Sequence, residues 1–221
     1  MNLNPFAPRR GKFKLIPNIY NRKGRRLAIQ LNQGDRKKRR KARRKTRRKL
    51  LGQGYWGKVY RQNHFAVRKE LRPYPIINRR KIIQKEARIL KRLHGTGVAP
   101  KLYGTGKNHL DMEFVPGRRL RASVKNDPRQ QRVYGKRLAR SVKKMHNRGI
   151  YHGDLYDHNI TVTNSGKVKI LDYGLAKDKQ RSLTRKERER EISRTLSSYR
   201  GKRYRPLRSS FETEYKVERY R

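Results

Sequence analysis

The chain has 221 residues, of which 64 are Lys or Arg and 16 are Asp or Glu, so its formal net charge is +48. This excess predicts attraction to polyanions, with nucleic acid as the first candidate and an anionic membrane surface as the second. The absence of Cys excludes disulfides and Cys-based zinc sites, and no apolar run is long enough to span a bilayer. No secretory signal is visible, so we expect an intracellular protein in a nucleic-acid-rich compartment: nucleus, cytoplasm or virion.

Residues 1–49 are predicted to form a basic N-terminal arm. Its first 34 residues contain no acid and scattered Pro, Asn and Gly, which favours an extended segment ordered by a partner; a transit peptide is the weaker alternative. Residues 36–49, "RKKRRKARRKTRRK", hold 12 basic residues in 14, which repel one another in water. A localisation signal would also fit this run, but the charge excess continues beyond it and favours nucleic-acid contact.

Residues 50–116 are predicted to form a first lobe rich in strands. The stretch "LLGQGYWGKVYRQNHFAVRKEL" indicates a strand, a Gly-rich turn and a second strand. A helix is expected from Asn78, its N-cap, to Leu93, and "APKLYGTGKNHLDMEFVPG" predicts two short strands and a turn. The helix carries one apolar face made of Ile82, Ile83, Ala87, Leu90 and Leu93.

Residues 117–200 are predicted to form a second lobe. A helix from Asp127 to Arg148 would begin with Asp127 as cap and Pro128 in its first turn, and would end at Gly149. Residues 160–172, "ITVTNSGKVKILD", predict a β-hairpin.

Two features are expected further along the chain. Thr184 and Glu187 form a capping-box pattern that opens a helix ending at about Leu196. Residues 201–221 form a basic Tyr/Arg-rich tail without a clear period. The tyrosines of the last part of the chain would either stack on bases or dock onto the second lobe.

Carboxylates and amides concentrate in "YHGDLYDHNITVTNSGKVKILDYG", residues 151–174. Asp154 and Asn159 are five apart, and the hairpin after Asn159 would return the chain so that Asp172 lies beside it. Asn159 and Asp172 could then share a divalent cation, with Asp154 close by but free of it. Mg²⁺ suits such a site because it prefers oxygen ligands and usually binds together with substrate phosphates.

The glycines of "GQGYWGKV" give a second signal. Gly52, Gly54 and Gly57 form G-x-G-x-x-G, with Val59 following, but what comes next is a strand rather than the helix of a dinucleotide site. A glycine turn between antiparallel strands can lie over phosphates, because the backbone can approach them closely.

Residues 50–174 resemble the protein-kinase superfamily in the order of their motifs. "GQGYWGKV" is similar to its Gly-rich loop, "FAVRK" to its lysine strand and "LDMEFVPG" to the segment between the lobes. "HGDLYDHN" takes the place of the usual H-R-D-L-x-x-x-N motif, and "DYG" takes the place of D-F-G. "HGDL" and the short remainder of the chain look like the small atypical kinases of the Bud32 and RIO type. The resemblance implies an α+β fold: an antiparallel-sheet N-lobe with one main helix and a minimal helical C-lobe.

The resemblance also implies ATP and Mg²⁺ as cofactors and assigns roles to residues. Asp154 would accept or orient the substrate hydroxyl proton, Asn159 and Asp172 would hold the metal, and Glu86 would pair with the nucleotide cation. Met112 would border the adenine pocket, and the backbone from Glu113 to Val115 would bond the base. The cofactor-binding set is Gly52, Gly54, Gly57, Val59, Ala66, Met112, Glu113 and Val115.

The chain departs from the kinase pattern at three positions. Counting two residues from Ala66 gives Arg68 where kinases have Lys, with Lys69 next to it. Because a strand without a bulge turns these neighbours to opposite faces, we expect Arg68 to point inward and contact phosphate. The alternatives are a one-residue bulge that turns Lys69 inward, or impaired nucleotide chemistry. Gly153 replaces an Arg that usually pairs with a phosphorylated segment, so such regulation is not expected. Tyr156 stands where protein kinases carry a second catalytic Lys.

The first hypothesis is a minimal Ser/Thr-type protein kinase, with a protein substrate, tethered to nucleic acid as part of a larger nucleoprotein assembly. The second is a catalytically impaired pseudokinase that serves as a structural nucleic-acid-binding protein of a virion, chromatin or ribosome. Arg68 favours the second hypothesis, and intact Asp154, Asn159 and Asp172 favour the first. A small-molecule kinase, which would share "HGDL", is a distant third.

Overall fold

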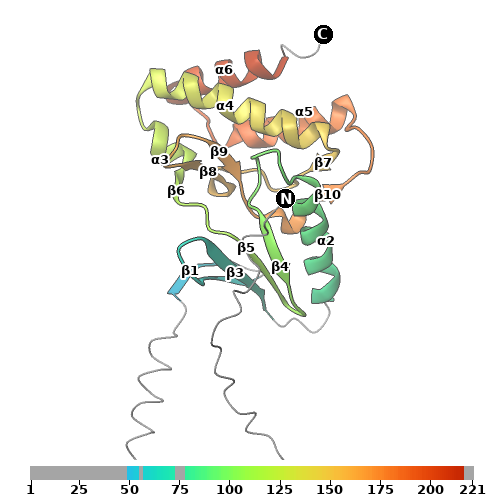
Figure 1. Cartoon of the computed structure of the whole chain (residues 1–221). Helices are drawn as coiled ribbons and strands as arrows, with labels where there is room; N and C mark the ends of the chain where they lie inside the picture. The colour runs from blue at the N-terminus through green and yellow to red at the C-terminus, as the bar shows by residue number, and fades with distance from the viewer. Residues whose placement is uncertain (1–48, 55–56, 73–77, 217–221) are drawn as a thin grey trace, which may run out of the picture. The chain divides into compact units, whose positions relative to one another are not determined.

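The computed structural model describes residues 49–54, 57–72 and 78–216. Almost all of the predicted basic arm, Tyr55 and Trp56 in the glycine turn, and the end of the predicted tail lie outside the described residues. The described residues form two groups of elements, a sheet with one long helix beside it and a second group dominated by helices (Figure 1). The expected two-lobed α+β architecture is confirmed.

The first lobe is a five-stranded antiparallel sheet with strand order β1-β2-β3-β5-β4. Its strands are β1 (Lys49–Gln53), β2 (Gly57–Arg61), β3 (Ala66–Leu71), β4 (Leu102–Thr105) and β5 (His109–Glu113). The helix α2 (Arg79–Arg92) covers the sheet and shares with it a small core of Leu71, Ile83, Ala87 and Leu110. The pairing of β3 with β2 and β5 runs without a register shift, so side chains on β3 alternate strictly between its two faces.

Helix α2 begins where the sequence predicts. The side chain of Asn78 accepts a hydrogen bond from the backbone N–H of Lys81 at 3.1 Å, which satisfies one of the unpaired donors of the first turn. Its apolar face buries Ile83 and Leu90, whereas Arg88 on the opposite face is exposed. The buried face also presents Glu86 toward the sheet, and this carboxylate becomes important for the site below.

The second lobe is built around α4 (Pro128–Asn147). Asp127 caps this helix by accepting from the N–H groups of Arg129 and Gln130, Pro128 stands in its first turn, and Gly149 follows its end with a φ of +71°. The other elements are β6 (Gly117–Arg119), α3 (Leu120–Val124), β7 (Ile150–Tyr151), β8 (Ile160–Thr163), β9 (Val168–Ile170), β10 (Lys177–Asp178), α5 (Arg185–Ser197) and α6 (Arg205–Lys216), with short 3₁₀ turns η2 (Asp157–Asn159), η3 (Tyr173–Leu175) and η4 (Lys202–Tyr204).

The predicted hairpin is formed by β8 and β9, which lie in a three-stranded sheet of order β6-β8-β9. At its open end the N–H of Leu171 donates to the carbonyl oxygen of Asn159 at 2.8 Å. The hairpin therefore brings Asn159 next to the residue that precedes Asp172, as the sequence analysis predicts.

The predicted capping box opens α5, because Thr184 and Glu187 bond each other's backbone N–H groups. The prediction that the last twenty residues lack a regular pattern is wrong, because α6 packs along α4 (Figure 1). Leu207, Phe211 and Tyr215, each four residues apart, form its buried stripe. Tyr199 and Tyr204 are also buried, so these tyrosines dock onto the lobe, one of the two alternatives considered.

The core of the second lobe continues into α2 through Ile89, Leu90 and Leu93, which join the same buried cluster as α4 and α6. The two lobes therefore share packed side chains as well as the connecting segment after β5. Among the described residues, no helix is long and apolar enough to cross a membrane.

Candidate active site

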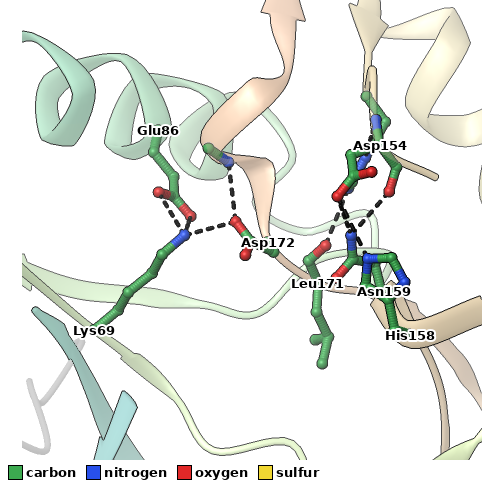
Figure 2. Close-up of polar contacts among 9 residues, drawn as sticks. Lys69, Glu86, Asp154, His158, Asn159, Leu171 and Asp172 are labelled. Carbon is green, nitrogen blue, oxygen red and sulfur yellow. Dashed lines mark hydrogen bonds and ion pairs between the residues drawn. The ribbon is translucent and has the colours of Figure 1, made fainter. Parts of the chain in front are cut away.

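Lys69 forms the centre of a buried charged cluster where the lobes meet. Its Nζ donates to Glu86 Oε1 at 2.9 Å, to Glu86 Oε2 at 3.0 Å and to Asp172 Oδ1 at 2.6 Å (Figure 2). The side chains of Lys69 and Glu86 are only 11% and 2% exposed. Burial acts to lower the pKa of Lys69, but the two carboxylates outweigh burial and raise this pKa above its usual value, so the ammonium stays charged.

The expectation that Arg68 points inward is wrong. Its guanidinium forms a two-pronged ion pair with Asp111 of β5 on the other face of the sheet, with both N···O distances 2.7 Å. The strand has no bulge, as expected. The inward cation was predicted as the residue two positions after Ala66, and Ala66 does not lie on the inward face. Alternation places Val67 and Lys69 on the face toward α2 and leaves Ala66 and Arg68 on the opposite face. Val67, rather than Ala66, therefore shares the face of Lys69.

Asp154 and Asn159 are joined within the loop after β7. The amide Nδ2 of Asn159 donates to the carbonyl oxygen of Asp154 at 2.8 Å and to its carboxylate Oδ2 at 3.0 Å (Figure 2). The N–H of Tyr156 donates to the carbonyl oxygen of Asp154, which closes the loop tightly. The Asp154 carboxylate is 32% exposed, and His158 Nε2 lies 3.4 Å from it.

Asp172 follows the hairpin in a left-handed conformation, with φ of +58°. Its Oδ1 accepts from Lys69 and from the N–H of Gly174, and its side chain is 54% exposed. Although burial of the carboxyl works in the opposite direction, Lys69 holds the pKa of Asp172 below its usual value. An ionised carboxylate thus faces the cleft side by side with the hairpin end that carries Asn159.

These oxygens fit a magnesium ion that also binds phosphates. The Nδ2 of Asn159 is used within the loop, which leaves its Oδ1 available, and Asp172 keeps a second carboxylate oxygen. Among the described residues, no cluster of three or more His, Asp or Glu side chains could hold a metal by itself. One carboxylate oxygen and one amide oxygen could hold a Mg²⁺ ion whose shell is completed by waters and phosphate oxygens.

Comparison with known proteins decides the family. The protein kinase domain matches residues 46–198. The chain belongs to the protein kinase family.

Relatives of this kinase-family chain are spread over distant organisms. It is 34% identical over 102 residues to the "Probable cAMP-dependent protein kinase catalytic subunit" of Encephalitozoon cuniculi, covering 42% of the chain and 32% of that protein. It is also 34% identical over 96 residues to the KEOPS complex subunit Bud32 of Pyrococcus abyssi, covering 42% of the chain and 43% of that protein. It is 30% identical over 142 residues to the CBL-interacting serine/threonine-protein kinase 13 of Arabidopsis thaliana, covering 58% of the chain and 28% of that protein.

The resemblance to protein kinases, including a Bud32 subunit, is therefore confirmed. The chain spans about a third of the length of the first curated relatives that it matches.

Several of the remaining residues with predicted kinase roles lie in the sheet of the first lobe near Lys69. Gly54 and Gly57 close the turn between β1 and β2, with an N–H to carbonyl bond of 2.9 Å. Val59 lies opposite Lys69 on β2, and Met112 lies opposite Val67 on β5. Glu113 does not use its side chain toward the cleft: its carboxylate bonds Lys169 of β9 at 2.6 and 2.7 Å.

Sequence reasoning missed Glu191, a fully buried carboxylate on α5. Its oxygens accept from the N–H groups of His152 and Gly153, at 3.0 and 2.7 Å, and from the ring of His146 at 2.9 Å. Burial raises the pKa of Glu191, but His146 and these donors outweigh burial and hold it below its usual value. Glu191 thereby fixes the backbone of the loop that carries Asp154. Nothing in "RKERERE" distinguishes it from its exposed neighbours except its position one turn before buried Thr195.

His152 supports the loop rather than facing the cleft. It is fully buried, its Nε2 lies 3.0 Å from the carbonyl oxygen of Leu171, and its ring packs against Tyr173. Burial lowers the pKa of His152, so the ring is neutral at pH 7. His152 therefore connects the Asp154 loop to the segment that ends in Asp172.

Proposed function

We propose that this chain is a minimal ATP- and Mg²⁺-dependent protein kinase of the Ser/Thr type. The observation that carries the proposal is the double contact of Lys69, with Glu86 in the same lobe and with Asp172 across the cleft. Asp154 and Asn159 bond each other on the adjoining loop. These groups supply a phosphate-binding cation, oxygen ligands for a metal, and a carboxylate for the attacking hydroxyl, which are the parts that phosphoryl transfer uses.

The nucleotide would lie under the turn between β1 and β2. Gly52, Gly54 and Gly57 would let the backbone approach the phosphates, and Val59 would contact the base from above. Met112 would border the base from β5, and the backbone from Glu113 to Val115 would bond its edge. The binding of the Glu113 carboxylate to Lys169 supports a backbone role for this segment, because the side chain is already engaged.

Catalysis would depend on positioning and charge. Mg²⁺ held by Asn159 and Asp172 would neutralise phosphate charge when bound. Lys69 would orient the phosphates. Asp154 would accept the proton of the substrate hydroxyl while the hydroxyl oxygen forms a bond to the γ-phosphorus. As that bond forms, the bond between the γ-phosphorus and the ADP oxygen breaks and ADP leaves. Asp154 would then pass its proton to solvent.

We also propose that the kinase is held on nucleic acid or in a nucleoprotein particle. Residues 1–50 contain 20 basic residues and one acid, and the remainder of the chain is basic as well. Contacts between Lys or Arg and phosphates give affinity without sequence specificity, and they release counterions, so binding weakens as salt rises. The pseudokinase alternative loses its main support, because Lys69 and not Arg68 pairs with Glu86.

Phosphotransfer from labelled ATP with Mg²⁺ tests the kinase proposal. The full chain should label itself or a mixture of acidic and basic proteins, and Asp172→Ala should abolish labelling. Arg68→Gln, a change outside the cleft, should keep it. If the full chain and Arg68→Gln both fail to transfer phosphate while remaining folded, the pseudokinase alternative replaces the enzyme.

Fluorescence anisotropy with single-stranded and duplex oligonucleotides of unrelated sequence tests the nucleic-acid proposal. Binding should be similar for all sequences, and the affinity should fall at least about 100-fold between about 50 and 200 mM salt. Affinity that does not change with salt would exclude phosphate contacts as its source.

A further inference from the structure

A basic pocket opens on the second lobe beside the Asp154 loop. It has a volume of about 800 Å³ and lies between β6, α3, η2, the end of α5 and η4. Its charged lining consists of Arg118, Arg119, Arg121, Lys125, Arg200, Arg203 and Asp157. Six cations thus face one carboxylate in a single concave site.

Most cations of this pocket have no acidic partner among the described residues. Asp157 already accepts from the N–H of Arg121 at 2.8 Å and from the hydroxyl of Tyr199 at 3.0 Å. Across the part of the chain that the structure describes, no carboxylate forms an ion pair with the side chain of Arg118, Arg119, Lys125, Arg200 or Arg203. Because like charges held in a concave site focus a positive potential, the pocket is suited to an anionic group.

Two of the pocket arginines lie close to the ring of Tyr204, which also lines the pocket. The guanidinium groups of Arg121 and Arg203 lie 5.6 and 5.1 Å from the centre of the Tyr204 ring. Arg121 also donates to the carbonyl oxygen of Ser198, so the end of α5 is joined to α3. A ligand would therefore meet arginines that aromatic and backbone contacts already hold in place, which lowers the entropy lost on binding.

The position of the pocket restricts what its ligand can be. Asp157 stands three residues after Asp154, so their Cα atoms are at most about 11 Å apart. An extended peptide advances about 3.3 Å per residue. A peptide whose Ser or Thr hydroxyl reaches Asp154 would therefore also place other side chains in the pocket. These side chains would lie about two to five residues from the phosphorylated Ser or Thr.

We propose that this pocket selects protein substrates with Asp, Glu or phosphorylated residues within about five positions of the phosphorylated Ser or Thr. The inference rests on the proposed kinase function and adds the substrate class. A peptide is favoured over a polynucleotide because the basic pocket is a single hollow next to the Asp154 loop, whereas a nucleic-acid strand requires a row of cations along its backbone. Arginine forks match carboxylate and phosphate groups in such a hollow.

Matched charge reversals test the pocket by binding. Arg119→Glu/Arg200→Glu alters two exposed pocket arginines, and Arg80→Glu/Arg88→Glu alters two exposed arginines of α2 on the other lobe, with the same change in net charge. Anisotropy of a labelled serine peptide flanked by glutamates should show at least about tenfold weaker binding for the pocket variant only. Equal binding by both variants would overturn the proposal, and so would loss of oligonucleotide binding alone.

Kinetics test the same pocket through substrate choice. The full chain should phosphorylate the glutamate peptide with a kcat/KM at least about tenfold above its glutamine analogue, mainly through KM. Arg119→Glu/Arg200→Glu should remove this preference while leaving the rate on the glutamine peptide unchanged. An unchanged preference in this variant would refute the inference. If no protein or peptide is phosphorylated at all, the proposed function fails, and the anisotropy result still decides whether the pocket binds acidic segments.

Discussion

Lys69 and Asp172 are separated by 103 residues in the chain, yet the ammonium of one lies 2.6 Å from the carboxylate of the other. The contact joins β3 of the first lobe to the residue that follows the β8–β9 hairpin of the second. Together with Glu86, it places a buried ammonium and a partly exposed carboxylate of the candidate site next to each other (Figure 2).

Replacing Lys69 should strongly reduce the phosphotransfer rate, whereas replacing Arg68 should leave it nearly unchanged. Lys69→Met removes the cleft cation, so we expect phosphotransfer to fall about 100-fold or more. Arg68→Met only breaks the partly exposed pair with Asp111, and its rate should stay within about threefold of the parent chain. Initial rates with labelled ATP measure both effects, and circular dichroism verifies the fold. Similar losses in the two variants would mean that the cleft cation is not Lys69.

Acidification below about pH 6.5 should destabilise the fold through His152. Burial holds the folded-state pKa of this ring below the usual histidine value of about 6.5, so below that pH the unfolded chain binds more protons than the folded chain. Stability is therefore full above pH 6.5 and is lost as the pH falls toward the folded-state pKa. Thermal unfolding from pH 7 to pH 5 should show a decline that His152→Gln reduces and that His94→Gln, at an exposed position, leaves intact.

Gly135→Ala should destabilise the chain although alanine is the better helix former. A Cβ at this position on α4 would overlap the backbone carbonyl oxygen of Leu207 on α6. Separating the two helices should cost about 1–3 kcal/mol of unfolding free energy, against the ~1 kcal/mol that helix propensity alone would add. Chemical denaturation measures the change, with Lys136→Ala at the neighbouring exposed position as control. A stabilised Gly135→Ala chain would contradict the close α4–α6 packing.

Glu191→Gln should loosen the loop that carries Asp154. The amide nitrogen introduced by the change would face a backbone N–H or the ring of His146, so a buried donor loses its acceptor at a cost of about 1–3 kcal/mol. Both the unfolding free energy and kcat should fall. Glu189→Gln, two residues earlier and half-exposed, should change neither quantity by a comparable amount. A normal kcat in Glu191→Gln would show that the loop keeps its geometry without this carboxylate.

Local chemistry made most of the fold predictable. Asn78, Asp127 and Thr184 cap helices because their side chains reach the unpaired N–H groups of the first turn. The hairpin after Asn159 was predictable because a turn sequence separates two β-rich runs, and this pairing brings Asn159 toward Asp172. The candidate metal ligands therefore followed from spacing alone.

The errors arose where the outcome depends on what lies across the cleft or the core. Arg68 and Lys69 are both cations on one strand, and only the partners Asp111 and Glu86 decide which of them faces inward. In the sequence, Glu191 looks like any other acid of an Arg-rich helix. Only its contacts with His146 and the Asp154 loop in the folded chain distinguish it. The apolar stripe of α6, by contrast, was visible in the four-residue spacing of its buried side chains and was overlooked among the charges.

The bond from Leu171 N–H to the Asn159 carbonyl has a dynamic consequence. It joins the two ends of the β8–β9 hairpin, so the two candidate metal ligands lie on one hydrogen-bonded unit. Lys69 lies on β3 of the first lobe. A displacement of β3 would therefore withdraw the ammonium from Asp172 without changing the spacing between Asp172 and Asn159, and the candidate magnesium ligands would stay together.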